Sequence, residues 1–477
     1  MTLRVLAVAS EIYPLVKTGG LADVVGALPS ALAACGIAVV TLVPGYPAVT
    51  DALEGASEIA AWTDLPGGPA RLLGGRAAGL ELFALDAPRF FDRPGNPYLA
   101  PDGTDWPDNG LRFAALGAAA ARLAHLLAVD AVHAHDWQAG LAPAYLRHAE
   151  GRAIPSLFTV HNLAFQGRFE ADLFPLLGLP PSAFAIDGVE FHGGVGFLKA
   201  GLWYADVLST VSPAYAEEIL TPEGGMGLEG LLRGRAESLF GIRNGLDVEE
   251  WNPATDPHLA ARFSADDPGP RAANADALRE RFALAPSASG PCFAFVGRLT
   301  WQKGIDLVLD ALPGLLEGGG QLVILGQGDA ALALACEAAA AAHPGRVGVF
   351  VGYSEPLARL VYGGADAVLV PSRFEPCGLV QLIAQRYGAI PVVARVGGLA
   401  DTVIDANDAA LSMGCGTGVM FAPASSSALA AAIRRTARLF RHRPSWQTVQ
   451  ANAMRLDVSW RGSAERYAAL FRRLAAG

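Results

Sequence analysis

The sequence alternates short apolar runs with longer amphipathic stretches, and this alternation constrains the fold more than any other feature. Leu3–Ala9 is a continuous apolar run, typical of a strand buried on both faces of a parallel sheet. This run is followed by a glycine-containing loop, a predicted helix over Leu21–Cys35 and a second apolar run over Ile37–Val43. Together the segments form a βαβ unit. Gly36 has the position of a helix C-cap. The pattern predicts an α/β fold built on parallel sheets.

The same pattern continues through both halves of the chain. Further strands are predicted at Ala131–His135, Ile154–Val160, Val207–Val211, Cys292–Val296, Leu322–Leu325, Ala367–Val370 and Ile390–Ala394. Further helices are predicted near Gln138–His148, Gly304–Leu312, Leu379–Tyr387 and Ser463–Ala476, the last with Arg461, Arg466, Arg472 and Arg473 on polar faces. Gly241–Asp247 looks like a hinge, and the polar, proline-rich stretch Asp256–Ala275 is predicted to join the second half. A chain of 477 residues is expected to form two or three domains.

Composition excludes several classes of function. The formal charge of −10 leaves no global basic surface for nucleic acid, so an anionic substrate must be held by a few local cations. The five cysteines are scattered without a CxxC pair, which indicates neither a disulfide framework nor a zinc site and favours reduced thiols in the cytoplasm. Charged residues interrupt the apolar stretch Ala114–Ala134, so we expect no membrane span.

A glycine-rich motif follows the first predicted strand. In Lys17–Asp23, adjacent Gly19 and Gly20 let backbone N–H groups approach an anion, and the start of the next helix adds positive character. Lys17 supplies a full charge at the same place; a glycine turn with a solvated lysine is the alternative interpretation. The segment Gly19–Val25 nearly repeats at Gly397–Val403, as expected for two Rossmann-like halves that each carry such a loop at strand ends.

Two motifs of the second half carry charge at strand ends. Arg298 and Lys303 lie in a short loop between a predicted strand and helix, where they can clamp a diphosphate, although a solvated basic loop has the same pattern. Glu375 lies in a proline-restricted turn before a helix, where it can face positive charge on a sugar carbon or serve as a helix cap. The N–H groups of Gly378 and Leu379 can bind phosphate oxygens.

Polar residues also end two strands of the first half. His161 can bind a sugar hydroxyl while Asn162 fixes its loop, although a lone histidine here is more often structural. His135 and Asp136 resemble metal ligands but lack a third ligand at a sensible spacing, so we expect no metal. The segment Gly326–Ala331 matches a dinucleotide fingerprint without its acidic partner, and we interpret it as a tight turn.

Taken together, these motifs resemble those of bacterial glycogen synthases and plant starch synthases. The matching blocks follow the family's order: Lys17–Asp23, His133–Gln138, Thr159–Asn162, Arg243–Asp247, Gly297–Gly304, Ser372–Gln381 and Gly397–Val403. The resemblance implies a GT-B architecture, in which two Rossmann-like domains face each other across a deep cleft. It implies an acceptor-side domain at 1–245, a nucleotide-sugar-binding domain at 246–455 and a C-terminal helix at 456–477 that crosses back to the first domain.

The resemblance also implies a reaction and a set of residues. The reaction is retaining transfer of glucose from ADP-glucose to the non-reducing end of an α-1,4-glucan, without metal or cofactor. The implied catalytic residues are Glu375, His161, Arg298 and Lys303. The implied substrate-binding residues are Lys17, Gly19, Gly20, Asp23, Tyr98, Asp136, Asn162, Asn244, Tyr353, Cys377, Gly378 and Leu379. Among these, Asp23 would lie near the ribose, Tyr353 on the base, and Tyr98, Asp136 and Asn244 on the acceptor side or in the cleft.

The sequence departs from the family's pattern in places. The second glutamate of many retaining GT-B enzymes is replaced by Ile383, and Val380 and Val396 stand where threonine is common, which bears on donor affinity. Two alternatives remain open: another GT-B transferase that uses UDP-glucose and a small acceptor, and a non-catalytic sugar-nucleotide-binding protein. The sequence does not discriminate among the nucleotide bases.

Overall fold

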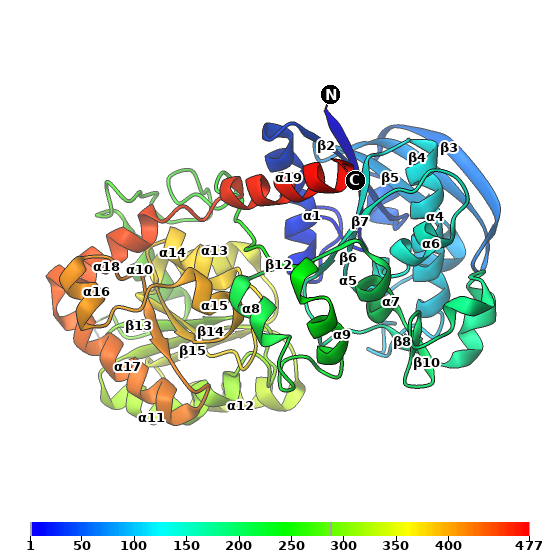
Figure 1. Cartoon of the computed structure of the whole chain (residues 1–477). Coiled ribbons are helices and arrows are strands. Elements are labelled where there is room, and N and C mark those ends of the chain that lie inside the picture. Colours follow the sequence, from blue (N-terminus) through cyan, green and yellow to red (C-terminus); the bar gives the residue numbers. More distant parts are fainter. Residues whose placement is uncertain (1, 287–288, 477) are drawn as a thin grey trace. The chain divides into compact units, whose positions relative to one another are not determined.

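The computed structural model describes residues 2–286 and 289–476 and divides into two compact units. The first unit contains Met1–Gly245 together with Trp460–Gly477, and the second contains Leu246–Ser459 (Figure 1). Met1 and Gly477, which the predicted domain bounds include, lie outside the described residues.

The first unit is built on a sheet with the strand order β12-β11-β7-β6-β1-β2-β5-β4-β3. Its strands are β1 Leu3–Val8, β2 Ile37–Pro44, β3 Glu54–Leu65, β4 Gly68–Ala77, β5 Leu80–Asp86, β6 Ala131–His135, β7 Ser156–Val160, β11 Val207–Thr210 and β12 Leu239–Gly241. Pairing is parallel from β12 to β5 and antiparallel among β5, β4 and β3. The carboxyl ends of the central strands therefore meet at one edge, where ligands bind in open α/β sheets.

Helices cover this sheet, and the last helix of the chain is among them. The helices are α1 Gly20–Ala34, α2 Pro47–Thr50, α3 Pro88–Phe91, α4 Asn109–Leu126, α5 Asp136–Ala139, α6 Ala142–His148, α7 Phe197–Tyr204, α8 Pro213–Glu218, α9 Glu229–Gly234 and α19 Arg461–Ala476. Short strands β8 Arg168–Phe169, β9 Glu190–Phe191 and β10 Gly194–Gly196 and the 3₁₀ turns Ala171–Leu176, Pro181–Ala183 and Ala236–Ser238 complete the unit. Helix α19 lies beside α1 (Figure 1), and its Tyr467 and Phe471 share a core with Leu28.

The second unit has a smaller, wholly parallel sheet with the order β15-β14-β13-β16-β17-β18. Its strands are β13 Cys292–Val296, β14 Gln321–Gly326, β15 Val347–Val351, β16 Ala367–Val370, β17 Ile390–Ala394 and β18 Val419–Phe421. Its helices are α10 Arg271–Arg281, α11 Ile305–Glu317, α12 Ala330–Ala342, α13 Glu355–Gly364, α14 Val380–Arg386, α15 Gly397–Thr402, α16 Asp408–Met413, α17 Ser426–Arg441 and α18 Arg443–Arg455.

Two apolar cores sandwich the sheet of the second unit. Phe293 and Phe295 of β13 join the core beneath α11 and α17, whereas Cys292 and Ala294 join the core on the opposite face. Figure 1 accordingly shows α11, α12 and α17 on one side of the sheet and α10, α13 and α14 on the other. This alternation confirms the predicted α/β class, because a strand buried on both faces needs apolar residues at every position.

Three local predictions differ from the structure. The helix predicted at Gln138–His148 is two short helices, α5 and α6, separated by Gly140 and Leu141. The prediction that Asp256–Ala275 is a joining segment is wrong: Asp256 is buried within the second unit, and α10 begins at Arg271. The edge strands β3 and β4 were not predicted, since β3 is mostly exposed and lacks an apolar run.

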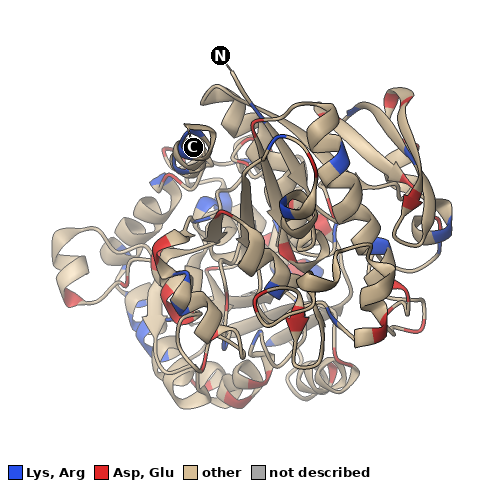
Figure 2. Cartoon of the chain, turned by 45° about the vertical axis from the view of Figure 1, so that its right-hand side comes forward, with Lys and Arg blue, Asp and Glu red and all other residues tan. Residues whose placement is uncertain are grey.

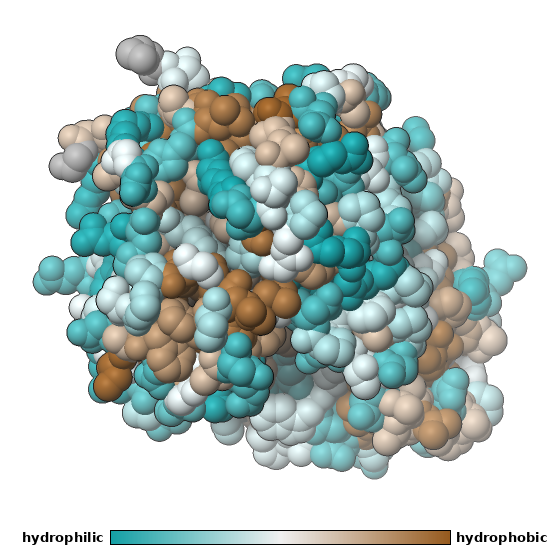
Figure 3. Space-filling view, turned by 90° about the vertical axis from the view of Figure 1, so that its right-hand side faces the viewer, coloured by the Kyte–Doolittle hydropathy of each residue, from teal (hydrophilic) through white to brown (hydrophobic). Residues whose placement is uncertain are grey.

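The surface is mixed in charge and polarity. Figure 2 shows lysine and arginine interspersed with aspartate and glutamate instead of gathered on one face. On the face seen in Figure 3, apolar side chains form small patches between polar ones. In the part of the chain that the structure describes, no helix combines the length and apolarity that crossing a bilayer requires.

Candidate active site

The glycine-rich loop of the first unit lies at the carboxyl end of β1. Helix α1 begins at Gly20, so its free N–H groups point out of the loop at the place where the sequence predicted an anion site. The Lys17 Nζ lies 2.7 Å from the Asp23 Oδ1 and 5.2 Å from the centre of the Tyr13 ring. Lys17 is thus exposed to solvent, with its charge held at the start of the helix by Asp23.

A residue that the sequence analysis did not select, Glu11, organises this loop. Its carboxylate is 3% exposed and accepts the Thr18 hydroxyl at 2.6 Å, the Gly19 N–H at 3.3 Å and the Thr18 N–H. The Gly19 N–H was expected to face an anionic ligand, and the structure gives it an internal acceptor instead. The available signal was the Ser10-Glu11 pair directly after a buried strand, at the edge where ligands bind.

Tyr98 also belongs to this network. Its hydroxyl donates to the Glu11 carboxylate and lies 2.8 Å from the Ser10 Oγ. Burial and the neighbouring Glu11 raise the pKa of Tyr98 well above its usual value, so the phenol keeps its proton. The sequence predicted Tyr98 as an acceptor-side or cleft residue, and its hydroxyl is directed to the glycine-rich loop.

Three buried histidines lie beneath the neighbouring strand ends. The His135 Nδ1 lies 2.9 Å from the His161 Nε2, and the His133 Nε2 lies 2.6 Å from the Thr159 hydroxyl. The rings of His133 and His135 are 3.9 Å apart. Burial lowers the pKa of both His133 and His161 to about 3, so these rings are neutral at pH 7. His161 can therefore hydrogen-bond a sugar hydroxyl but is not a cationic acid.

Asp136 fixes the backbone next to His161. It adopts a left-handed conformation, with φ of 55°, that places its Oδ1 2.7 Å from the His161 N–H and 3.4 Å from the Asn162 N–H. Burial, against the lowering effect of these backbone bonds, raises the pKa of Asp136 to about 7. A strained residue at a strand end with a perturbed carboxyl is typical of a functional site.

Asn244 presents an acceptor that no protein group uses. The residue is 9% exposed, and in the described part of the chain its side-chain oxygen has no hydrogen-bond partner. A buried orphan acceptor is unfavourable unless water or a ligand supplies a donor. The prediction of Asn244 as a substrate-binding residue fits this position.

In the second unit, Lys303 and Glu375 form the central ion pair. Lys303 follows β13 and Glu375 follows the adjacent strand β16, so the two motifs meet at one sheet edge. The Lys303 Nζ lies 2.6 Å from the Glu375 Oε2, which also accepts the Ser372 hydroxyl at 2.8 Å. Glu375 is 6% exposed, so its charge is held by this pair. Glu375 is not a simple helix cap, because α14 begins only at Val380.

The two arginines near this sheet edge differ in how free their guanidinium groups are to bind a ligand. Arg298 is exposed, and its guanidinium makes a bond of 3.3 Å to Gln302. Arg373, by contrast, is held by Asp306 at 2.6 and 2.9 Å and stacks on Trp301. Arg298 can therefore turn toward a ligand, whereas Arg373 braces the loop that carries Lys303.

Glycines shape the turn after Glu375. Gly378 has a φ of 75°, and a Cβ there would meet the Gln381 side chain. A Cβ on Gly398 would lie 2.4 Å from the Cys377 Cα, so α15 can approach Cys377 only with glycine at this position. Gly398 donates its N–H to the Glu375 carbonyl at 3.0 Å. The second glycine repeat thus supports the turn that carries Glu375, Cys377 and Leu379.

Tyr353 and the segment Gly326–Ala331 both lie in the second unit. Tyr353 is 68% exposed just before α13, and its hydroxyl bonds Glu355 at 3.1 Å. Gly326 and Gly328 pack directly on the backbone of Gly297 and Leu299, which confirms the interpretation of that segment as a tight turn. Within residues 2–286 and 289–476 no group of three or more histidine, cysteine or acidic residues has the geometry to hold a metal.

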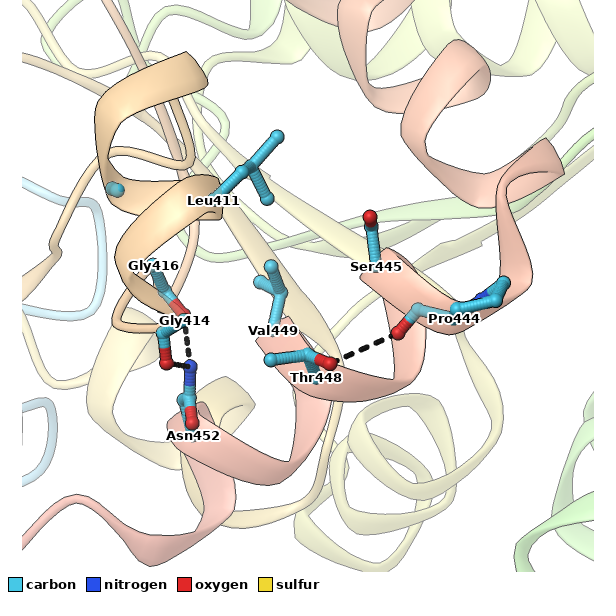
Figure 4. A pocket seen from close by; sticks show the side chains of 9 residues that line it. Leu411, Gly414, Gly416, Pro444, Ser445, Thr448, Val449 and Asn452 are labelled. Atoms are coloured by element: carbon cyan, nitrogen blue, oxygen red, sulfur yellow. Dashed lines mark hydrogen bonds between the residues drawn. The ribbon is translucent and has the colours of Figure 1, made fainter.

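A separate hollow of about 130 Å³ lies between α16 and α18 (Figure 4). Its polar side chains are already used: Asn452 donates to the carbonyls of Gly414 and Gly416, and Thr448 donates to the Pro444 carbonyl. None of the predicted site residues lines it. We therefore assign the chemistry to the two strand edges described above.

Comparisons with known proteins agree with the motifs. The family model described as "Starch synthase catalytic domain" matches residues 4–234, and the model described as "Glycosyl transferases group 1" matches residues 276–444. A glycogen synthase of Rhodopseudomonas palustris (strain BisA53) is 56% identical over 478 residues, which cover 99% of this chain and 98% of that protein. A glycogen synthase of Acidiphilium cryptum (strain JF-5) is 57% identical over 476 residues, covering 99% of each.

A solved structure extends the likeness to the whole fold. The catalytic domain of starch synthase IV from Arabidopsis thaliana, bound to ADP and acarbose, superposes with a TM-score of 0.91 and covers 100% of both chains at 30% identity.

Proposed function

This chain belongs to the family of bacterial glycogen synthases and starch synthases, and on that premise we propose how its residues transfer glucose from ADP-glucose to the non-reducing end of an α-1,4-glucan. Its fold is GT-B, with two Rossmann-like units. A relative of 30% identity was solved with ADP and acarbose bound, which supports a nucleoside diphosphate donor and a sugar acceptor.

Breaking the bond between glucose and phosphate leaves negative charge on the diphosphate. Lys303 and Arg298 follow the central strand of the second unit and bring two cations to the diphosphate, with Arg298 free to form a bidentate contact. Lys17, at the start of α1, contributes a third cation from the first unit. Once these cations contact the bound diphosphate, they stabilise the negative charge that develops on it as the bond to glucose breaks.

The carboxylate of Glu375 stabilises the positive charge that develops on the sugar. The single observation that carries the proposal is the partly buried Lys303–Glu375 pair, with Ser372 donating to the same carboxylate oxygen. The bonds from Lys303 and Ser372 fix the position of the carboxylate in the absence of substrate. When the diphosphate recruits Lys303, the carboxylate faces the anomeric carbon, and the acceptor hydroxyl attacks from the side that the phosphate leaves, passing its proton to that phosphate.

The first unit supplies the sugar contacts. Neutral His161 and the loop anchored by Asp136 bind glucose hydroxyls, and the Asn244 oxygen accepts from a hydroxyl. We assign acceptor binding to residues 1–245, donor binding to 246–455 and a bracing role to 456–477. The five free cysteines, two of them only partly buried, support a reducing, cytoplasmic location.

The proposal is tested with purified protein, glycogen and either ADP-glucose or UDP-glucose, by following nucleotide release. Lys303→Met and Glu375→Gln should each lower kcat by about 10²–10³-fold, the range found when one transition-state contact is lost. The surface variant Arg455→Met is the control and should keep wild-type kcat. Faster release from UDP-glucose than from ADP-glucose would contradict the assignment of the donor.

The double variant Lys303→Met/Glu375→Gln separates two explanations. If Lys303 acts only through Glu375, the double variant should be as active as Glu375→Gln alone, which would remove the separate leaving-group role of the lysine. If each residue acts on the transition state independently, the double variant should lose the product of the two single losses.

A further inference from the structure

Glu11 is a buried carboxylate whose bonding partners are all neutral. It accepts two backbone N–H groups and two hydroxyls, from Thr18, Gly19 and Tyr98. Among the described residues no lysine or arginine bonds it, because Lys17 pairs with Asp23 instead. A buried carboxylate without a counter-ion is retained only where its hydrogen bonds offset the lost hydration.

The donors that Glu11 binds all come from the loop before α1 or from a single distant side chain. Thr18 and Gly19 stand between Lys17 and the first residue of the helix. Fixing both amides fixes the direction in which the chain enters α1. The direction of the Lys17 side chain and of the free N–H groups at the helix start follows from this.

The second support comes from the segment 93–108, which closes on itself. Arg93 and Asp108 pair at its base at 2.8 and 2.9 Å, and Arg93 stacks on Trp106. The Tyr98 backbone is held from both sides, by Asn96 at 2.8 Å and by Asn109 at 3.0 Å. These contacts hold the Tyr98 backbone where its phenol hydroxyl reaches Ser10 and Glu11.

We propose that Glu11 and Tyr98 are positioning residues for the donor diphosphate: together they hold residues 17–19 so that Lys17 and the start of α1 face the leaving group. This inference rests on the proposed function. Glu11 and Tyr98 touch neither the donor nor the acceptor; they act through Lys17 and the loop.

The test compares Tyr98→Phe and Glu11→Gln with the matched control Tyr145→Phe. Tyr145 also loses a hydroxyl bond in the first unit, to the Leu177 carbonyl at 2.7 Å, but on α6 and away from the loop. Initial rates are measured against ADP-glucose and against glycogen, with the melting temperature of each variant. Phenylalanine keeps the ring near Phe113, at 6.1 Å in the wild type, so the fold is expected to survive.

Tyr98→Phe should lower kcat/KM for ADP-glucose about tenfold, as for loss of one hydrogen bond to a charged group, with the KM for glycogen unchanged. Glu11→Gln should lower kcat/KM for ADP-glucose by about a hundredfold, since the amide has one accepting oxygen, whereas both oxygens of the Glu11 carboxylate accept hydrogen bonds. The double variant should have the same kcat/KM as Glu11→Gln, because the effects of two residues in one hydrogen-bond network are not additive. If Glu11→Gln does not fold, Tyr98→Phe decides alone.

Three results would overturn the inference. One is an equal rise in the KM for ADP-glucose and the KM for glycogen, which indicates general damage. Another is a Tyr98→Phe variant that behaves like Tyr145→Phe. The third is a lower KM for ADP-glucose in Glu11→Gln, which would mean that the carboxylate competes with the diphosphate. An inactive wild type would instead refute the proposed function itself.

Discussion

Replacing Arg359 by methionine should destabilise the second unit far more than replacing an exposed arginine. The Arg359 side chain is 4% exposed and stacks 4.4 Å from the centre of the Trp251 ring. Its guanidinium bonds Glu355 at 2.8 Å, Asp256 at 3.2 Å and Glu250. The Asp256 side chain is fully buried, so the arginine is its only cationic partner among the described residues.

The size of the destabilisation depends on which hydrogen bonds Asp256 retains after Arg359→Met. Methionine preserves the length and the apolar contact of the arginine stem, but Asp256 retains only the Tyr387 hydroxyl at 2.5 Å and the His258 N–H at 2.9 Å. Removing one partner of a buried ion pair costs about 3–5 kcal/mol. For a unit of this size, about 2–4 °C accompanies each kcal/mol, so the unfolding transition should fall by roughly 6–20 °C.

Differential scanning calorimetry measures this shift. Arg455→Met is the control: it also removes an ion pair, but its side chain is 57% exposed and that of its partner Asp266 is 91% exposed, so the transition should scarcely move. The double variant Arg359→Met/Asp256→Asn should recover part of the loss, because the uncompensated charge is gone. An Arg359→Met protein that melts with the control would refute the reasoning.

Three further outcomes are expected. Burial raises the pKa of Asp136 from 3.8 to about 7, so between these pH values the folded protein holds a proton that the unfolded chain releases. The wild type should therefore lose stability relative to Asp136→Asn as the pH rises from about 4 to about 7. If urea titrations give the same difference in unfolding free energy between the two proteins across that range, the reasoning is contradicted. Tyr353→Ala should raise the KM for ADP-glucose about tenfold through lost base stacking, with Tyr353→Phe unaffected in initial-rate assays. Phe471→Ala should lower the free energy of unfolding by about 3–5 kcal/mol in urea titrations, because the ring is 1% exposed beneath His133; a loss below about 1 kcal/mol would show that the site is loosely packed.

The sequence predicted the fold well where one physical rule dominates. Strands buried on both faces, such as β13 and β17, must be continuously apolar, and their ends were predicted to the residue. The edge strand β3 has no such requirement, since it is mostly exposed. Asp256 was misplaced for a related reason: its composition is that of a loop, and only the distant partner Arg359 explains its burial.

The candidate site was predicted in its residue types but not in its contacts. Lys303 and Glu375 were each selected from their strand ends, yet their pairing depends on β13 lying next to β16, a neighbour relation set by the whole sheet. Glu11 and Tyr98 are 87 positions apart, and no local pattern announces that the two side chains meet. Contacts between residues far apart in the sequence depend on which strands are neighbours in the sheet. The periodicity of apolar residues along the sequence does not specify those neighbours.

The placement of α19 has a consequence for synthesis on the ribosome. The second unit is one continuous segment, whereas Tyr467 and Phe471 of the first unit are synthesised only after the whole second unit. At ~5–20 residues per second, the nascent first unit waits on the order of tens of seconds with the apolar face of α1 uncovered. The half of the enzyme that is made first is thus the half that finishes folding last, and it is the one in which a chaperone or a truncating mutation would act.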